Sequence, residues 1–392
     1  MSVGGSWNIY KEKFFQADFV DMLKLRASYG IGGNIGRNTA PYLIASYYDS
    51  SLVDGMAGSV NTPPNKDIRW EKTTTVNVGV DFALFRHRLS GTIEYYNKYS
   101  VDLLAAINGS PTQGFGYTTL MTNNGKMVNR GVEITLSGEI IRQKDFSWNA
   151  SLLYAFNRNK VKHISVQPSL WDSRISMPTS YPMVGKPLYG IYAYKWAGLN
   201  ENGDPQVYDA ENNVTSGPAR DYHALVYCGT TVPIHNASLT NVLRYKGFEF
   251  SAMLILDAGH KLRSSNIPSI NMSNGRITST AKGIVDRWTQ PGDVTDVPRL
   301  LFSNDTENFN THRTELYRYS DLFVYDASNI RLSNISLAYR VPAHWCKKIS
   351  LSGARLQFNV ENVATFAFDS KANYDLGGKV KPNYVWGLYL NF

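Results

Sequence analysis

Strict alternation of apolar and polar residues recurs along this chain and limits its fold more than any other feature. In residues 75–85 every second residue is apolar; these are Val76, Val78, Val80, Phe82 and Leu84. The same period returns in residues 88–96, 131–140, 148–157, 248–257 and 354–361. Successive side chains of a strand point to opposite faces, so each segment predicts a strand with one apolar and one polar face. Helical periodicity is weak throughout, and an all-β fold is predicted.

Three further features favour a membrane barrel over a soluble sandwich of two sheets. The predicted strands have about ten residues or more, as a tilted membrane strand needs, whereas ordinary strands have about five or six. Short connections near 85–87, 142–144 and 245–247 alternate with long ones at 31–70, 100–128, 158–186, 211–235, 260–325 and 363–382. The chain also ends on an alternating strand with an aromatic last residue; one face carries Tyr384, Trp386, Leu388, Leu390 and Phe392. These features predict an antiparallel up-and-down transmembrane β-barrel segment with long extracellular loops and short periplasmic turns.

The same pattern predicts about twelve membrane crossings. They are expected near 21–30, 72–84, 87–99, 129–140, 146–157, 187–197, 205–210, 236–245, 248–259, 326–340, 350–362 and 383–392. The seventh depends on a hairpin turn at Asn200–Asp204, since Asn-Gly is a strong hairpin signal. Residues 1–20 are interpreted as a lead-in from a preceding strand, and residues 21–392 as the C-terminal part of a barrel.

Composition and cysteine count exclude several other classes of protein. Hydrophobic residues make up 43% of the chain, so disorder is not expected. The formal charge of +8 is spread without a basic stripe, so no nucleic-acid partner is predicted. Cys228 falls in a predicted outer loop and Cys346 in a predicted periplasmic turn, about 25 Å or more apart. That separation is too large for a disulfide, so two free thiols are expected.

No residue pattern in the chain predicts catalysis, a metal or a cofactor. The seven histidines include no metal-spaced pair, and no Gly-x-Ser-x-Gly motif is present, so an enzyme is not expected. Asn200, Asn202 and Asp204 resemble a calcium loop faintly, but the flanking ligands are missing and a plain turn is the simpler interpretation. The start of the chain has no signal-peptide pattern, which indicates a lost signal or a start partway into a longer protein.

Two groups of residues are candidates for contact with a substrate or partner. Polar residues on the inner strand faces line either a substrate path or a solvated wall against a plug; these are Asn77, Asp81, Glu94, Glu133, Glu139, Arg355 and Glu361. Loop aromatics either stack on sugar rings or pack within the loops and against a partner; these are Tyr47, Tyr48, Tyr117, Trp171 and Tyr181.

Several stretches, in order along the chain, resemble the C-terminal barrel of SusC/RagA-type TonB-dependent importers. They are Leu23–Gly30 followed by Gly33 and Asn34, Asp67–Thr73, Leu89–Asn97, Asn124–Glu133, Phe156–Val161, Val184–Tyr192, Tyr245–Phe248, Asp286–Gly292, Ala327–Leu332 and Asn359–Val363. The match runs from about residue 20 to the end. The C-terminal strand also resembles the one that the outer-membrane assembly machinery recognises.

The resemblance implies a plugged barrel of about 22 strands in the outer membrane of a Gram-negative, Bacteroidota-like cell, in contact with its lipids. It also implies energy from TonB, a SusD-like surface lipoprotein over the mouth, and an oligosaccharide or peptide cargo. The sequence shows no plug, TonB-contacting segment or N-terminal extension, so the chain is expected to supply about twelve strands of the wall. A surface or secreted β-rich glycan-binding module and a passive porin remain the alternatives.

Overall fold

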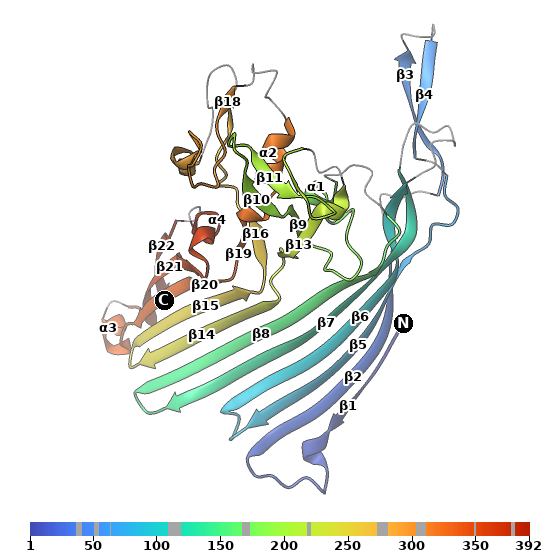
Figure 1. Cartoon of the computed structure of the whole chain (residues 1–392). Helices are drawn as coiled ribbons and strands as arrows, with labels where there is room; N and C mark the ends of the chain where they lie inside the picture. The colour runs from blue at the N-terminus through green and yellow to red at the C-terminus, as the bar shows by residue number, and fades with distance from the viewer. Residues whose placement is uncertain are drawn as a thin grey trace.

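The computed structural model describes residues 1–36, 41–50, 55–62, 64–108, 119–166, 173–217, 221–272, 281–302, 311–348, 350–377 and 381–392. Its main feature is one curved antiparallel sheet of eleven strands, with β1 and β22 at its two edges (Figure 1). In spatial order the strands are β1 (Ser2–Asn8), β2 (Val20–Asn34), β5 (Glu71–Leu84), β6 (Leu89–Asn108), β7 (Thr119–Arg142), β8 (Phe146–His163), β14 (His235–Tyr245), β15 (Phe248–Ala258), β20 (Asn329–Arg340), β21 (Gly353–Ala367) and β22 (Asn383–Asn391).

The connections between these strands are short at one end of the sheet and long at the other. The β5–β6 turn is tight, and Phe85, Arg86 and His87 all take positive φ there. The β14–β15 turn consists of Lys246 and Gly247, and the β20–β21 turn holds the short helix α3 (Ala343–Lys347). The opposite end carries a hairpin of β3 (Ile44–Ser50) and β4 (Gly55–Thr62) and two long connections. The predicted fold class, with short turns and long loops at opposite ends, is confirmed.

Ten of the twelve predicted crossings lie in the main sheet, but two are wrong. Residues 187–197 and 205–210 form β9 (Gly190–Tyr194), β10 (Trp196–Leu199) and β11 (Pro205–Tyr208), which pair in small separate sheets. Strands of four or five residues are too short to cross a membrane, and β9 is buried along its whole length. The predicted turn at Asn200–Asp204 is correct, because it joins β10 to β11.

One strand of the sheet was missed. Within the predicted lead-in, β1 pairs with β2 from Ser2 to Asn8. Its sequence, rich in glycine and serine, has too little apolar contrast to reveal a period of two. The sheet therefore has eleven strands, and the C-terminal strand keeps its predicted direction.

The hydrophobic core lies among the long connections and not beneath the sheet. We call the described residues of 164–234 and 259–328 the loop body, which lies beyond one end of the sheet (Figure 1). Its core consists of two clusters, Tyr192, Tyr194, Val207, Ala224, Leu225 and Leu316, and Ile270, Tyr317 and Phe323. The other elements of the loop body are α1 (Ser173–Ser176), β12 (Val214–Thr215), η3 (Tyr222–Ala224), β13 (Leu225–Thr230), β16 (Lys261–Arg263), β17 (Asn271–Met272), η4 (Lys282–Asp286), β18 (Leu301–Phe302), α2 (Thr311–Arg318), η5 (Asp321–Phe323) and β19 (Val324–Asp326).

Short helical segments make up the remaining structure. They are η1 (Ile9–Lys11) between β1 and β2, and η6 (Ser370–Ala372) and α4 (Asn373–Gly377) between β21 and β22. Of the helices in the described ranges, none has the length and apolar character needed to span a membrane.

Candidate functional site

The register of the sheet separates its side chains into an apolar face and a polar face. On β8, the apolar face carries Phe146, Trp148, Ala150, Leu152, Tyr154 and Phe156, and the polar face carries Ser147, Asn149, Ser151, Leu153, Ala155 and Asn157. Pairing continues both faces across the neighbouring strands. One row on the apolar face is Val80, Ile93, Ile134, Tyr154, Ala237 and Leu256. The adjacent row on the polar face is Gly79, Glu94, Glu133, Ala155, Asn236 and Asp257.

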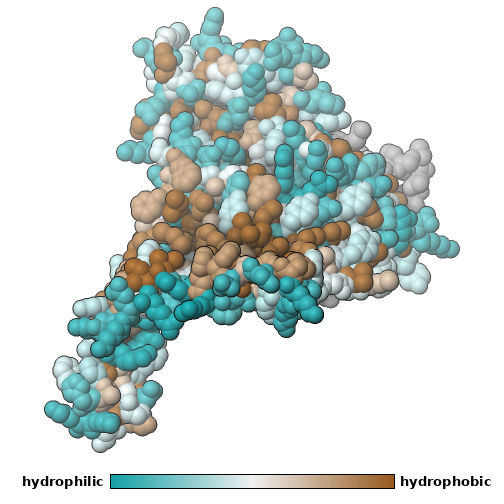
Figure 2. Space-filling view, turned by 90° about the horizontal axis from the view of Figure 1, so that it is seen from below, coloured by the Kyte–Doolittle hydropathy of each residue, from teal (hydrophilic) through white to brown (hydrophobic). Residues whose placement is uncertain are grey.

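The apolar face is open to the surroundings instead of being buried against a second layer. Ile93 is 43% exposed and Leu337 is 47% exposed. Seen from below in Figure 2, hydrophobic residues form a band with hydrophilic residues on both sides of it. Phe146 and Phe156 are ten positions apart, roughly 33 Å along the strand at about 3.3 Å per residue. A strand tilt of roughly 40° reduces this to about 25 Å, the height of the apolar band on outer-membrane barrels.

An ionic cluster joins three strands on the polar face. The Nε of Arg26 on β2 lies 3.1 Å from the Asp81 carboxylate on β5, and its guanidinium also pairs with Glu94 on β6. The Thr92 hydroxyl donates a further hydrogen bond of 3.0 Å to Asp81. Gly79 lies between Arg26 and Glu94 in the register, and a Cβ there would be 3.1 Å from the Arg26 Cζ. The lack of a side chain at residue 79 therefore lets the guanidinium cross β5.

A groove of about 400 Å³ with a mixed polar and apolar lining lies over β7, β8, β14 and β15. Among its lining residues are Glu133, Thr135, Asn236, Ser238 and Asp257. The Asn236 amide donates to Asp257 at 2.7 Å, and Arg331 pairs with the same carboxylate at 3.4 Å. The groove offers hydroxyl, amide and carboxylate groups, which suit water, a sugar or a peptide backbone.

Gly131 allows a tyrosine to lie across the polar face. Gly131 on β7 pairs with Tyr96 on β6 and with Asn157 on β8. A Cβ at residue 131 would overlap the Tyr96 hydroxyl and would lie 2.5 Å from the Phe156 carbonyl oxygen. The tyrosine ring therefore occupies the space that a side chain on β7 would fill.

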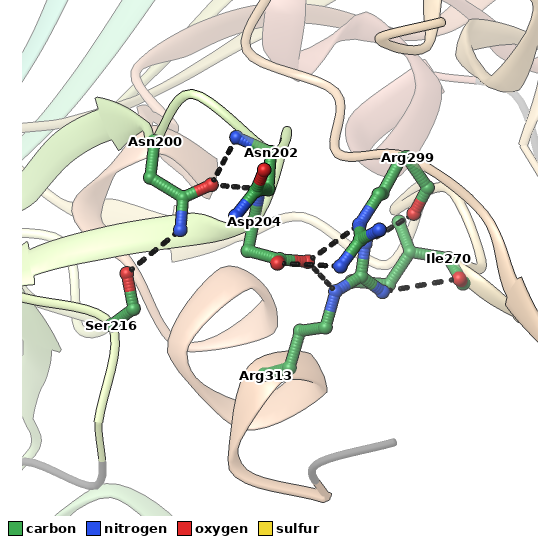
Figure 3. A network of polar contacts seen from close by, with 7 residues as sticks. All are labelled: Asn200, Asn202, Asp204, Ser216, Ile270, Arg299 and Arg313. Carbon is green, nitrogen blue, oxygen red and sulfur yellow. Dashed lines mark hydrogen bonds and ion pairs between the residues drawn. The ribbon is translucent and has the colours of Figure 1, made fainter. Parts of the chain in front are cut away.

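In the loop body, one carboxylate holds three segments together (Figure 3). Asp204, the last residue of the β10–β11 turn, accepts hydrogen bonds from Arg299 at 3.1 and 2.8 Å and from Arg313 on α2 at 2.7 Å. Arg313 also donates to the Ile270 carbonyl at 3.3 Å and to the Arg299 carbonyl. Its side chain is only 4% exposed. Burial alone would raise the pKa of Asp204, but the hydrogen bonds from both arginines outweigh it, so this pKa lies below its usual value.

The turn that carries Asp204 is closed by its own amide and packed under a tryptophan. The Asn200 side-chain oxygen accepts from the backbone N–H of Asn202 at 3.0 Å and of Asp204 at 2.9 Å. Gly203 has a φ of +73°, and a Cβ there would overlap the Trp288 ring. The side-chain oxygens of Asn200 and Asp204, two of the three that suggested a calcium loop, are thus engaged in hydrogen bonds within the protein, as in a plain turn. Among the residues that the structure describes, no group of His, Cys, Asp or Glu could hold a metal ion.

The predicted loop aromatics do not form one group. Tyr47 and Tyr48 are neighbours on β3, 72% and 53% exposed, in a hairpin that extends away from the sheet (Figure 1). Tyr181 is buried, with 8% exposure, and its carbonyl accepts from Arg174 at 3.3 Å. Tyr117 and Trp171 lie outside the described residues. Their proposed contact with sugars or a partner stays a prediction.

The C-terminal strand and the cysteines lie where the sequence placed them. Tyr384, Trp386 and Leu388 pair with Val360, Phe358 and Leu356 of β21. The role of this strand in barrel assembly, including Leu390 and the terminal Phe392, stays a prediction. Cys228 lies in β13 of the loop body and Cys346 in α3 at the turn end, and both are free, which confirms the prediction of two thiols. Burial raises the pKa of the Cys228 thiol to about 11.

The Arg26 cluster and the Asp204 network were missed by sequence reasoning. Arg26 was visible as a cation between Leu25 and Ala27, on the same strand face as the polar residues of β5. Asp204, Arg299 and Arg313 gave no signal, because 95 and 109 residues separate the arginines from the aspartate.

Comparison with known proteins places the sheet in a family. The family model "TonB dependent receptor-like, beta-barrel" matches residues 2–363. TonB-dependent receptor P3 of Formosa agariphila is 26% identical over 98% of this chain and 39% of its own length. TonB-dependent receptor SusC of Bacteroides thetaiotaomicron is 26% identical over 92% of this chain and 36% of its own length.

The fold agrees with a solved transporter. "Structure of the RagAB peptide transporter" superposes with a TM-score of 0.77 and 24% identity, covering 100% of this chain and 43% of that one. The chain thus spans about two fifths of the length of the relatives it matches. The resemblance to the SusC/RagA type inferred from the motifs is confirmed, and the relatives named here are receptors and a transporter. The chain belongs to the TonB-dependent receptor-like β-barrel family.

Proposed function

We propose that this chain forms about half of the wall, and the outer loops, of an outer-membrane importer for an oligosaccharide or a peptide. The observation that carries the proposal is the single curved sheet, whose apolar face is exposed over about 25 Å while its opposite face is hydrogen-bonding and charged. Such a sheet suits lipid on one side and a wet lumen on the other.

The proposed partners follow from the family and from the shape of the sheet. A SusD-like surface lipoprotein would cover the loop body, with Tyr47 and Tyr48 on the projecting hairpin as candidate contacts for it or for cargo. TonB would act through a part of the transporter outside this chain. Outer-membrane lipids would contact the apolar face, and the assembly machinery would bind the C-terminal strand, in a cell of the Bacteroidota type. SusC and the RagAB peptide transporter are the relatives that suggest a glycan or a peptide as cargo.

Uptake by living cells tests this proposal. A strain lacking the gene should lose accumulation of one labelled oligosaccharide or peptide from a panel, and the restored gene should return it. A protonophore should abolish that accumulation, because TonB draws on the proton gradient. Equal uptake with and without the protonophore would favour a passive porin. Uptake of the whole panel at wild-type rates in the deletion strain would refute an import role.

The other alternative, a soluble glycan-binding module, makes a different prediction about membranes. Its apolar strand faces would have to be buried against each other, whereas Ile93 and Leu337 are exposed here. Carbonate washing of the membranes should leave the importer in the pellet, and a soluble module in the supernatant.

A further inference from the structure

At the loop end of β8, the residues on the apolar face are basic instead of aromatic. The residues that follow Phe156 on this face are Arg158 and Lys160. In the register, Arg158 lies opposite Arg130 of β7, and Arg130 lies opposite Asn97 of β6. These cations therefore lie on the same side of the sheet as the apolar band, at the edge of the band nearest the loops, and not on the polar face.

These cations have no carboxylate partner within the described ranges. Arg130 donates from Nε to the Asn97 side-chain oxygen at 3.0 Å, which fixes its guanidinium without neutralising it. Arg158 and Lys160 are exposed and make no ion pair among these residues. The arginines of the polar face differ, because Arg26 and Arg355 each pair with an acid. A cluster of unneutralised cations attracts an anionic ligand.

A cleft of about 430 Å³ lies beside the upper end of β8. Arg158, Lys160 and Lys186 contribute to its lining, and Phe156, Tyr227 and His235 supply aromatic walls. The Lys186 ammonium lies 4.8 Å from the centre of the Tyr227 ring. Below it, the Tyr154 hydroxyl and the His235 Nδ1 are 2.8 Å apart. The cleft thus combines a basic rim with an aromatic wall that continues into the apolar band.

We propose that this cleft binds the phosphorylated headgroup of an outer-leaflet lipid, whose acyl chains lie along the apolar face of β8 and β14. Phosphate oxygens accept from Arg158, which lines the cleft, and from Arg130, which is paired with it on β7, and Lys186 supplies a further positive charge. The inference rests on the proposed membrane position, but not on the cargo. A lipid fits better than cargo, because Arg130 and Arg158 lie on the opposite side of the wall from the polar face.

Binding of defined lipids to the complete transporter, purified from outer membranes, tests the site. The probes are diphosphorylated lipid A, its dephosphorylated form and inorganic phosphate, followed by native mass spectrometry and competition. The variant Arg130→Gln/Arg158→Gln/Lys186→Gln should bind diphosphorylated lipid A at least about tenfold more weakly, since each surface cation contributes a several-fold change in affinity for anionic lipid. The control Lys24→Gln/Lys98→Gln/Lys144→Gln removes the same charge from the polar face and a turn, and should bind as the wild type does.

Each other outcome contradicts the proposal. Equal loss in both triple variants would mean that only net charge matters. Equal binding of the dephosphorylated lipid would remove the role of phosphate, and displacement of lipid by millimolar inorganic phosphate would indicate a site for soluble anions. Should the triple variant fail to assemble, Lys186→Gln, which lies outside the strands, must still weaken lipid binding when compared with Lys144→Gln.

Discussion

At the scale of single residues, the Asp204 carboxylate links three segments of the loop body through Arg299 and Arg313. Asp204→Asn would leave the buried Arg313 guanidinium without a counter-charge. Breaking a buried ion pair in this way lowers the stability of the fold by about 3 kcal/mol. We expect the outer loops of the complete protein to become much more sensitive to limited proteolysis, whereas the membrane-embedded strands stay protected. Glu211→Gln, in an exposed turn, is the control. Identical digestion of the two variants would contradict the proposed clamp.

The loop body should also loosen in acid. Burial alone would raise the pKa of Asp326, but hydrogen bonds from Ser328 and Lys261 outweigh it and hold this pKa at about 2, below the ordinary 3.8. A lowered folded-state pKa contributes stability that is complete above the unfolded pKa and is lost as the pH falls toward the folded one. Tryptophan fluorescence of the complete protein should therefore change between pH 4 and about pH 2. Asp326→Asn should flatten that change, and an unaltered profile in the variant would refute the assignment.

At the scale of elements, the packing of β6 on β7 depends on Gly131. In Gly131→Ala the new methyl group should push away both the Tyr96 ring and the β8 backbone. This should lower the stability of the sheet by about 1–3 kcal/mol, as at other overpacked sites. We expect less heat-modifiable, assembled barrel in the membrane. Adding Tyr96→Ala should recover part of it, because only the overlap with the Phe156 carbonyl remains. Gly32→Ala, where a Cβ meets nothing within 4 Å, should assemble normally. If Gly131→Ala assembles as well as Gly32→Ala, the packing argument is wrong.

The elements also show how far sequence alone could go. In a strand with lipid on one side and water on the other, every second residue shows which face is apolar, so β2, β5 to β8, β14, β15 and β20 to β22 were predictable. This signal fails for β1, whose glycines and serines differ little in polarity. It misleads at β9, where a strand buried on both faces looks like a membrane strand without crossing anything. The Asp204 network was beyond sequence reasoning, because charge pairs between distant loops leave no periodicity.

At the scale of the whole molecule, the sheet is open. Within the described residues, β1 and β22 each have one strand neighbour, so each presents a row of unpaired backbone groups. Each unsatisfied group costs several kcal/mol in hydrocarbon, and the open eleven-stranded sheet leaves both of its edge strands unpaired on one side. These 392 residues, expressed alone, should therefore give no folded monomer in detergent. A monomeric band that migrates faster before heating than after it would contradict this expectation.

The central claim is that the apolar face of the sheet contacts lipid and the polar face a wet lumen. Fluorescence quenching along β8 of the complete transporter tests it most directly, with Cys228 and Cys346 replaced by serine and alanine. A bimane label on Leu152→Cys or Ala150→Cys should be strongly quenched by nitroxide-labelled lipids, and the same label on Ser151→Cys or Asn149→Cys should be quenched little. Equal quenching at neighbouring positions, or stronger quenching on the serine and asparagine side, would contradict the account.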